Sequence, residues 1–225
     1  MIRVAITTDR FDDAAVSYAA VGLEPVSVPC IEVEPSPANR LVGARVASSR
    51  ADLLVVTSPR AVSILWPAGG MPAVDAVVVG KKTGDAVAGA GGRVILVGDG
   101  GLSRLVDLAG SRFEGKRVVI VRAAGTEAAA LTHLRRSAPW LDEHVVYDSK
   151  PVAPDATAVD AVGFASPSSV VGWALARGFD DLVVGAIGRT TSAAVARHRV
   201  PDVVAKQPSH GALAEAIAEH MELRV

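Results

Sequence analysis

The chain has 225 residues, enough for one large domain or two small ones. Half of the residues are hydrophobic but only 4% are aromatic, so Val, Ala, Leu and Ile must fill the interior, and extended disorder is excluded. The formal net charge of −1 at pH 7 excludes a general attraction to nucleic acid or to an anionic membrane, so a charged ligand would need locally placed residues.

Short β-branched runs alternate with longer Ala-rich segments along the whole sequence, which is the pattern of βαβ units around a parallel sheet. Most of these runs are continuous Val, Ile and Leu, as expected of strands buried on both faces. In chain order the predicted strands are Arg3–Thr8, Val26–Glu34, Leu53–Ser58, Ala76–Gly80, Val94–Gly98, Arg117–Arg122, His144–Ser149, Ala161–Ser166, Val183–Gly188 and Asp202–Lys206. Between them, segments such as Glu127–Arg136 and Ala212–Met221 carry apolar residues at helical spacing.

An internal repeat relates the predicted elements to one another. A shift of 108 residues lays DLLVVTSPRAV on DAVGFASPSSV, with Ser58 on Ser166, and also lays Thr83 on Thr191. Upstream, RVVIVRA resembles RVAITTD, and VVYDSKPVAP resembles VSVPCIEVEP, at slightly different offsets. The sequence therefore predicts two copies of a five-strand α/β unit.

Each copy contains one long, Pro-ended segment, Val26–Pro37 in the first and Val145–Pro154 in the second. Central strands do not tolerate prolines, so we interpret these segments as a two-part connector between two lobes. If the chain crosses there twice, the middle of the sequence forms one lobe and the two ends together form the other. The pattern by itself does not separate this layout from a simple division near residue 112.

Hydroxyl and basic residues recur where the predicted strands end. Ligands of open parallel sheets bind outside the carboxyl ends of the strands, where loops lead into helix N-termini. A strand followed by Ser, Pro and a helix places a hydroxyl at the N-cap and leaves backbone N–H groups for an anion. Each such end alone fits an ordinary capped helix, and each basic residue alone fits a solvated surface charge. Together they predict a site for a ligand with several carboxylates or phosphates, and the candidate residues are Arg10, Thr57, Ser58, Arg60, Thr83, Arg122, Ser166, Ser168, Arg189 and Thr191.

Other catalytic patterns are weak in this sequence. The five histidines lack metal-ligand spacing, so no metal site is predicted. GDGGLS lacks the third glycine of a dinucleotide fingerprint and fits a capping turn, and neither a Gly-x-Ser-x-Gly elbow nor a P-loop occurs. Tyr147 is one of two tyrosines and lies in the second connector segment, where it could contact a ligand or pack in the interior.

The single cysteine indicates the compartment. Cys30 can form no internal disulfide, which favours a reducing cytoplasm. The N-terminus has no hydrophobic segment of signal-peptide length, and no apolar run approaches the roughly 20 residues of a membrane-spanning helix. We therefore expect a cytoplasmic protein with no membrane or nucleic-acid partner.

The ordered set VVTSPRAV, VVGKKTGDAV, VVYDSKP, VGFASPSSV, AIGRTTSAAV and VVAKQPSHGAL resembles the uroporphyrinogen-III synthase family over nearly the whole chain. The resemblance implies two flavodoxin-like lobes with parallel five-stranded sheets, joined by a two-stranded connector. It supports the layout in which the chain crosses twice. Lobe one would comprise residues 1–34 and 151–225, lobe two residues 37–147, and the connector strands about residues 30–37 and 146–153.

The resemblance implies a cyclising lyase of porphyrin and heme biosynthesis, monomeric and without metal or organic cofactor. Its substrate would be the linear tetrapyrrole hydroxymethylbilane, which carries eight carboxylates and is closed to uroporphyrinogen III with inversion of ring D and loss of water. Tyr147 matches the family's connector tyrosine and is the candidate acid, whereas Ser58, Ser166, Thr83 and Thr191 are expected to bind substrate. A transient contact with the preceding enzyme of the pathway is a further expectation.

Three other hypotheses remain beside the synthase. The first is a non-catalytic tetrapyrrole or anion sensor that uses the same two lobes. The second, a periplasmic solute-binding protein, shares the two α/β lobes but needs an export signal. The third, a dinucleotide enzyme, is the least favoured because the glycine fingerprint is incomplete.

Overall fold

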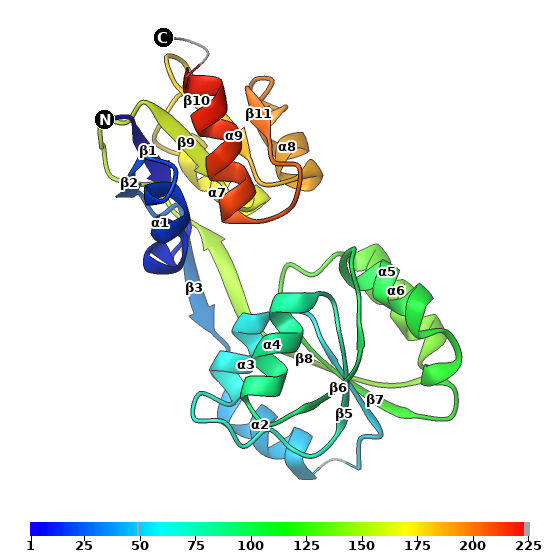
Figure 1. Cartoon of the computed structure of the whole chain (residues 1–225). Helices are drawn as coiled ribbons and strands as arrows, with labels where there is room; N and C mark the ends of the chain where they lie inside the picture. The colour runs from blue at the N-terminus through cyan, green and yellow to red at the C-terminus, as the bar shows by residue number, and fades with distance from the viewer. Residues whose placement is uncertain (49, 223–225) are drawn as a thin grey trace. The chain divides into compact units, whose positions relative to one another are not determined.

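The computed structural model describes residues 1–48 and 50–222. The chain forms two compact units, one made of Met1–Val33 with Ser149–Val225 and the other of Glu34–Asp148. We call them unit 1 and unit 2. Each unit contains a β-sheet with helices against both faces (Figure 1). No helix in the described part of the chain combines the length and the apolar character that crossing a bilayer requires.

Unit 1 has a five-stranded sheet in the order β11-β10-β9-β1-β2, and each of its strand pairs is parallel. The strands are β1 (Arg3–Ile6), β2 (Glu24–Ser27), β9 (Ala161–Phe164), β10 (Val183–Ala186) and β11 (Val203–Val204), and the helices are α1 (Phe11–Ala19), α7 (Pro167–Ala174), α8 (Arg189–Val195) and α9 (His210–Glu222). Helices α1 and α9 pack on one face and α7 and α8 on the other.

Alternation along β1 shows why both faces of this sheet are covered. Val4 and Ile6 belong to the cluster beneath α1 and α9, whereas Ala5 belongs to the cluster beneath α7 and α8. All three side chains are fully buried, as a continuous apolar strand in a three-layer α/β unit must be. On the second face Phe164 packs edge-on against Trp173, with ring centroids 5.8 Å apart.

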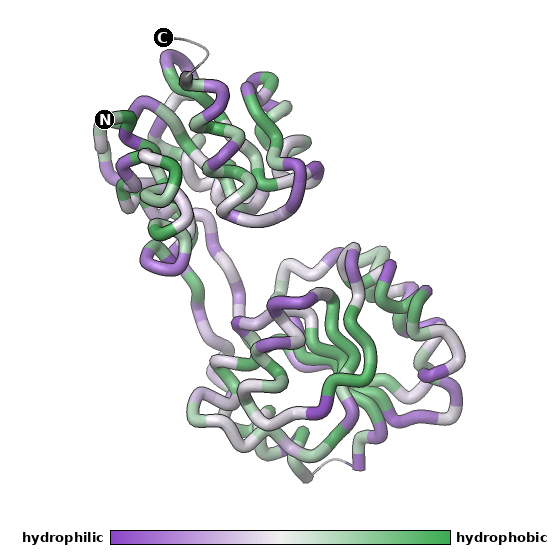
Figure 2. The backbone as a smooth tube through the Cα atoms, in the orientation of Figure 1, coloured by the Kyte–Doolittle hydropathy of each residue, from purple (hydrophilic) through white to green (hydrophobic). Residues whose placement is uncertain are grey.

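Unit 2 is built around a six-stranded sheet in the order β3-β8-β7-β4-β5-β6. The strands are β3 (Ile31–Pro35), β4 (Leu53–Val56), β5 (Asp75–Val78), β6 (Arg93–Val97), β7 (Arg117–Ala123) and β8 (Trp140–Pro151), and the helices are α2 (Asn39–Ser48), α3 (Pro59–Leu65), α4 (Lys81–Gly89), α5 (Gly101–Ala109) and α6 (Ala128–Ser137), with a short 3₁₀ turn at Gly110–Phe113. Helices α5 and α6 cover one face, with Phe113 fully buried beneath them, and α3 and α4 cover the other (Figures 1 and 2).

The internal repeat is present as repeated structure. Strand β4 and helix α3 correspond to β9 and α7, β5 and α4 correspond to β10 and α8, and β6 and α5 correspond to β11 and α9. Strands β7 and β8 of unit 2 hold the places that β1 and β2 hold in unit 1, because each pair lies on the same side of the matching strand. The two sheets thus share the same spatial order of five strands. Along the chain, however, β1 and β2 come before the other three strands of unit 1, whereas the matching strands β7 and β8 come after β4, β5 and β6 in unit 2.

Three predictions about strands need correction. The single strand predicted over Val26–Glu34 is two strands, β2 and β3, which lie in different sheets. Pro29 lies at the break and has no N–H for a ladder, while the Val28 and Cys30 amides bond to the Ile6 and Thr7 carbonyls at the end of β1. Strand β8 is longer than the predicted His144–Ser149, and the sheet of unit 2 has a sixth strand because β3 joins β8.

Gly172 on α7 provides a test of the packing in unit 1. A Cβ added there would overlap the Cys30 carbonyl oxygen and lie 2.8 Å from the Val152 carbonyl oxygen. Both obstacles are backbone atoms, and the Val152 amide donates a hydrogen bond to the Cys30 carbonyl, so neither can move cheaply. We expect Gly172→Ala to lower the free energy of unfolding by about 1–3 kcal/mol, measured by urea denaturation.

Gly211 on α9 is the matched control in the same unit, because a Cβ added there meets nothing within 4 Å. We expect Gly211→Ala to leave the unfolding midpoint unchanged or to raise it slightly, since Ala favours a helix over Gly by about 0.5–1 kcal/mol. Equal behaviour of the two variants would contradict the close approach of α7 to this backbone.

Candidate functional site

Two of the predicted hydroxyl residues lie at the end of β4 in unit 2. Ser58 is the N-cap of α3, with Pro59 at the first helical position, and its Oγ accepts a hydrogen bond from the Ala61 amide at 3.1 Å. Thr57 donates from Oγ1 to the Val121 carbonyl of the neighbouring strand β7 at 3.3 Å. The sequence Thr-Ser-Pro therefore does two local tasks, since it closes the strand onto β7 and starts the helix.

Tyr147 on β8 lies against this end of β4. Its hydroxyl donates to Ser58 Oγ at 3.0 Å, and its side chain is only 8% exposed. The Tyr147 carbonyl accepts a hydrogen bond from the Ala124 amide at 2.8 Å, which fixes the backbone of β8 at this residue. The guanidinium carbon of Arg60 lies 5.7 Å from the centroid of the Tyr147 ring. Three predicted site residues, Ser58, Arg60 and Tyr147, are therefore brought together within unit 2.

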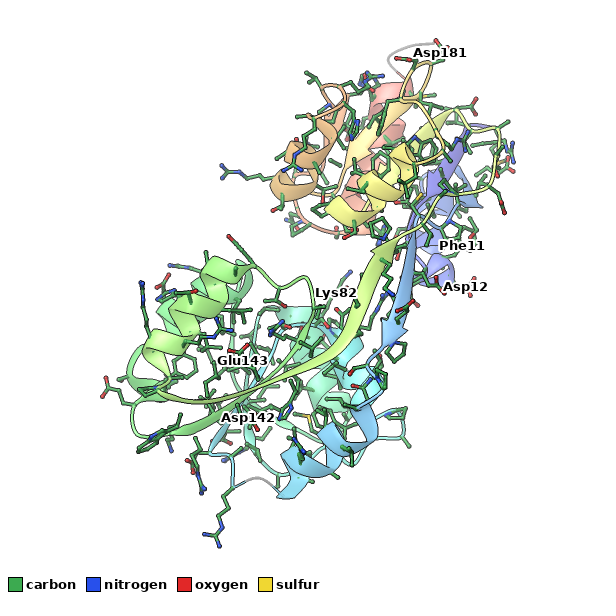
Figure 3. All side chains as sticks on the ribbon, turned by 180° about the vertical axis from the view of Figure 1, so that it is seen from behind. Phe11, Asp12, Lys82, Asp142, Glu143 and Asp181 are labelled. Carbon is green, nitrogen blue, oxygen red and sulfur yellow. The ribbon has the colours of Figure 1, made fainter. Side chains whose placement is uncertain are left out.

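Arg122 forms an ion pair with Glu143. Two of its nitrogens, Nε and Nη2, donate to Glu143 Oε2 at 3.3 and 3.2 Å, and Nη1 donates to the Ala123 carbonyl at 3.0 Å. Glu143 also accepts from Arg135 Nε at 2.6 Å. Figure 3 labels Glu143 in unit 2, beside the strand β8 from which it projects. Sequence reasoning did not single out this glutamate, because an ion pair between side chains on two adjacent strands leaves no pattern in the local sequence.

These two arginines favour the ionised form of Glu143. Burial by itself would raise the pKa of its carboxyl group, but hydrogen bonds and charge from Arg135 and Arg122 outweigh burial and lower the pKa below its ordinary value. Arg122 and Glu143 are 13% and 20% exposed, so the pair is more shielded from water than an ordinary surface ion pair.

The N-terminus of α4 carries Thr83 and two lysines. Thr83 is buried in the first turn of the helix, which has Gly80 as its N-cap and no acidic residue in that turn. Lys81 and Lys82 are exposed; Lys81 Nζ lies 2.8 Å from Asp85 Oδ2, and Figure 3 labels Lys82 at the start of the helix. Two lysines therefore give this helix N-terminus positive charge, which Asp85 partly offsets.

In unit 1 the corresponding strand end carries a capping box. Ser166 is the N-cap of α7, and its Oγ accepts from the Ser169 amide at 3.2 Å. The buried Ser169 hydroxyl in turn donates to the Ser166 carbonyl at 2.8 Å. Ser168 is half-buried beside them. Ser169 was not among the predicted site residues, although a hydroxyl three positions after a Ser N-cap is a recognisable signal.

Other predicted residues of unit 1 are dispersed over two further strand ends. Arg10 precedes α1 and is exposed, with Nη1 4.0 Å from Asp13 Oδ2, and two acidic residues occupy the first turn of that helix. Figure 3 labels Phe11 and Asp12 there. Arg189 is exposed at the start of α8, where Thr191 is buried in an acid-free first turn. The α8 end therefore suits an anion better than the α1 end does.

Thr7 is a buried polar residue that sequence reasoning missed. It follows β1, and its Oγ1 donates to the Gly163 carbonyl of β9 at 3.1 Å. Thr57 makes the same kind of bond from β4 to β7. Each bond joins the two central strands of its sheet, at the switch point where open α/β sheets bind ligands. Within the repeat the two bonds run in opposite directions, because β1 corresponds to β7 and β4 corresponds to β9.

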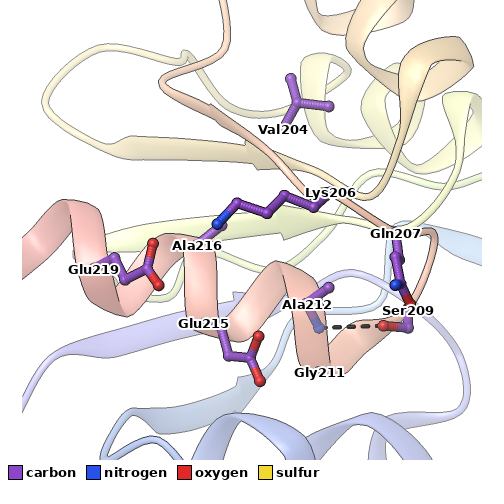
Figure 4. Close-up of a pocket in the computed structure, with 9 residues that line it drawn as sticks. All are labelled: Val204, Lys206, Gln207, Ser209, Gly211, Ala212, Glu215, Ala216 and Glu219. Atoms are coloured by element: carbon purple, nitrogen blue, oxygen red, sulfur yellow. Dashed lines mark hydrogen bonds between the residues drawn. The ribbon is translucent and has the colours of Figure 1, made fainter.

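A cavity of about 380 Å³ lies between the end of β11 and helix α9 in unit 1 (Figure 4). Lys206 crosses it, and Glu215 and Glu219 from α9 also line it. Two carboxylates against one ammonium make a poor site for a polyanion. Among the described residues no group of three His, Cys, Asp or Glu side chains could hold a metal ion.

Two α/β units of one strand order, with capped serines and basic residues at the carboxyl ends of their strands, define a class of repeated α/β proteins. The family model described as uroporphyrinogen-III synthase HemD matches residues 12–215. The chain belongs to this uroporphyrinogen-III synthase family, a family of cyclising lyases in heme biosynthesis. The expected family membership is thereby confirmed. A direct comparison of the sequence with curated proteins gives no match.

Solved structures of the same family share the fold. A uroporphyrinogen-III synthetase from Helicobacter pylori has a TM-score of 0.70 at 17% identity, covering 97% of this chain and 98% of that chain. A mutant uroporphyrinogen III synthase from Thermus thermophilus has a TM-score of 0.67 at 20% identity, covering 99% and 100%. The wild-type Thermus enzyme in another crystal form has a TM-score of 0.56 at 20% identity, covering 100% and 99%. At these identities the likeness establishes the mixed α/β fold.

The Glu143 ion pairs give a prediction with a defined pH dependence. We expect Glu143→Gln to lower the free energy of unfolding at pH 7 by about 1 kcal/mol, because one ionic acceptor of two arginines is lost. The folded-state pKa is lowered, so this contribution is complete above the unfolded value and is lost as pH falls through the folded pKa. Urea denaturation at several pH values checks this.

Glu114→Gln is the control, since Glu114 is exposed and has no ion pair in the described part of the chain. Its unfolding midpoint should follow the wild type at every pH. A Glu143→Gln deficit that stays constant down to about pH 3 would contradict the electrostatic origin.

Proposed function

We propose that this chain closes hydroxymethylbilane to uroporphyrinogen III, with inversion of ring D and loss of water. The observation that carries the proposal is the family match over residues 12–215. The eight carboxylates of this substrate also suit the capped serines and basic residues at the strand ends. A cytoplasmic location and a transient contact with the preceding enzyme are parts of the same proposal.

We propose that each unit is a flavodoxin-like lobe and that β3 and β8 supply the connector. The order β11-β10-β9-β1-β2 supports the first part, since numbering these strands by position along the chain gives the order 5-4-3-1-2 of flavodoxin-like sheets. Lobe one would comprise residues 1–34 and 151–225, and lobe two residues 37–147. The connector would comprise residues 30–37 and 146–153, which lie in β3 and β8 and in the residues that flank them.

Substrate carboxylates would be bound by hydroxyl, guanidinium and backbone N–H groups. In unit 2 these groups come from Thr57, Ser58, Arg60 and Thr83. In unit 1 they come from Arg10, Ser166, Ser168, Arg189 and Thr191. Charge-assisted hydrogen bonds of this kind contribute about 1.5–3 kcal/mol each. We leave Arg122 out of the proposed ligand set, because its guanidinium already holds Glu143 and the end of β7.

The chemical task is mainly one of geometry. Loss of the hydroxyl gives a conjugated azafulvene, and closure must then occur at the substituted carbon of ring D, whereas unassisted closure gives isomer I. Fixed contacts to the side-chain carboxylates can impose this choice, and oriented dipoles can stabilise the developing cation. Tyr147 is the proposed source of the proton that the departing hydroxyl takes up, since its hydroxyl lies among the other candidate groups of unit 2.

A non-catalytic tetrapyrrole sensor with the same strand ends is the alternative. Such a protein would bind the substrate or its products without changing the isomer that forms. Formation of uroporphyrinogen III above the background therefore separates the two functions, whereas binding alone does not.

We expect the purified protein to turn hydroxymethylbilane, generated in situ, into uroporphyrinogen III as the predominant product. The isomers are separated chromatographically after oxidation to uroporphyrins. Hydroxymethylbilane without protein is the control and should give isomer I. Isomer I alone, formed at the rate of that control, would reject the enzyme and leave the sensor.

A further inference from the structure

The two copies of the strand-Ser-Pro-helix end differ in how the serine is satisfied. In unit 1 the Ser166 hydroxyl lies 3.4 Å from Ser169 Oγ, to which it donates, and Ser169 donates to the Ser166 carbonyl at 2.8 Å. Both hydroxyl protons are thus used inside the turn. This serine pair is complete without any ligand, so Ser166 has a structural partner for its proton.

In unit 2 the residue three positions after the serine is Ala61, which has no hydroxyl. Ser58 Oγ accepts from the Ala61 amide at 3.1 Å, as Ser166 Oγ accepts from the Ser169 amide, and it also accepts from the Tyr147 hydroxyl at 3.0 Å. A serine hydroxyl has two acceptor positions and one proton to donate. Both acceptor positions are filled, and no described residue accepts the Ser58 proton.

Tyr147 is also the residue that distinguishes this copy of the repeat. The repeated segments VVYDSKPVAP and VSVPCIEVEP lay Tyr147 on Val28, so unit 1 has an apolar residue at the matching position. One copy therefore pairs Ser166 with Ser169, and the other pairs Ser58 with Tyr147. Tyr147 donates a hydrogen bond to Ser58, and the Ser58 proton has no acceptor among the described residues. Two hydroxyl donors in series, the second with its proton available, form the arrangement of a proton relay.

We propose that Ser58 is the catalytic residue that protonates the departing hydroxyl of the substrate, and that Tyr147 is a positioning residue that resupplies Ser58 from behind. The inference rests on the proposed function and refines its chemistry. It also assigns the protonation step to unit 2.

The step balances without a cofactor. The Ser58 O–H proton passes to the oxygen of the substrate's hydroxymethyl group, the carbon–oxygen bond breaks, and water leaves with the bonding pair. Ser58 Oγ takes the Tyr147 proton as its own is lost, which leaves a phenolate. The proton released when the closed macrocycle regains its pyrrole rings returns to Tyr147, so no net proton is consumed.

The surroundings of Tyr147 favour this direction of transfer. Two hydrogen bonds donated to Ser58 Oγ polarise its own O–H bond and make it a better donor. The Arg60 guanidinium near the Tyr147 ring, 5.7 Å from its centroid, is attracted more strongly by a phenolate ring than by a neutral phenol. Tyr147 itself is nearly buried, whereas Ser58 is half-buried, so Ser58 is the member of the pair that a ligand can contact.

A double-mutant cycle tests the relay. We expect Ser58→Ala and Tyr147→Phe each to lower kcat about 100-fold with little change in KM, since general acid catalysis contributes roughly 10²–10⁴-fold. The double variant should be no more than about threefold slower than the slower single variant, because two residues of one relay are not additive.

Ala61→Ser is a sharper variant, because it builds the serine pair of unit 1 into unit 2. The new hydroxyl would accept the Ser58 proton, so kcat should fall about tenfold while the unfolding midpoint is kept. Ser58→Thr retains a hydroxyl and a good N-cap and should keep kcat within about threefold of the wild type. A Thr variant as slow as the Ala variant would mean that Ser58 acts through packing, which overturns the proposal.

Ser209→Ala is the matched control for loss of a helix cap. Ser209 Oγ accepts from the Ala212 amide at 3.2 Å at the start of α9, as Ser58 Oγ accepts from Ala61 at the start of α3. Both substitutions remove one capping bond and should lower the unfolding midpoint similarly, yet Ser209→Ala should leave kcat unchanged.

The outcomes separate the relay from the function on which it rests. Wild-type protein that forms no uroporphyrinogen III would overturn both. Active wild type with Ser58→Ala at full kcat, or a double variant whose loss is the product of the two single losses, would overturn the relay alone. In the latter cases Tyr147 would act on the substrate directly.

Discussion

In both units two neighbouring strands, β1 and β9 in unit 1 and β4 and β7 in unit 2, send their following helices to opposite faces of the sheet. The side-chain hydrogen bonds at the ends of these strands depend on this constraint. In unit 1 α1 follows β1 and α7 follows β9, and these helices pack on different faces. In unit 2 α3 follows β4 and α6 follows β7, again on different faces. Side chains at these strand ends therefore bond from strand to strand, as Thr7 and Thr57 do. Ligands of open α/β sheets bind at this position.

A duplicated unit allows one copy to change while the other keeps its structural bonds. Both copies retain the N-cap serine, Ser58 or Ser166, because a capped helix needs an acceptor there whatever the function. The residue that completes the serine's hydrogen bonds is not fixed by the cap. A second serine fills this role in unit 1, and a tyrosine from β8, two strands away from β4, fills it in unit 2. The difference between the copies therefore lies in which hydroxyl group is hydrogen-bonded to the N-cap serine.

Local patterns predicted the elements well because their causes are local. Continuous Val and Leu predicted β4 and β7, and Ser-Pro predicted the starts of α3 and α7. The prediction of one strand over Val26–Glu34 was wrong because the apolar run is continuous, while Pro29 and the bonds to the end of β1 divide it between two sheets. Arg122 lies at the end of β7, where the sequence placed it. Its pairing with Glu143 depends on the register of β7 with β8, which no sequence pattern encodes.

The sequence by itself determined an α/β chain with an internal repeat, its family, and the serines that cap its helices. These features follow from interactions within a few residues or from ordered motifs along the chain. The tertiary structure alone decided which hydroxyl meets which, because Tyr147 and Ser58 are 89 positions apart and meet only through the order of β8, β7 and β4 in one sheet. Strand order is set by how a whole unit buries its apolar faces, so a contact that depends on it cannot be read from either segment alone.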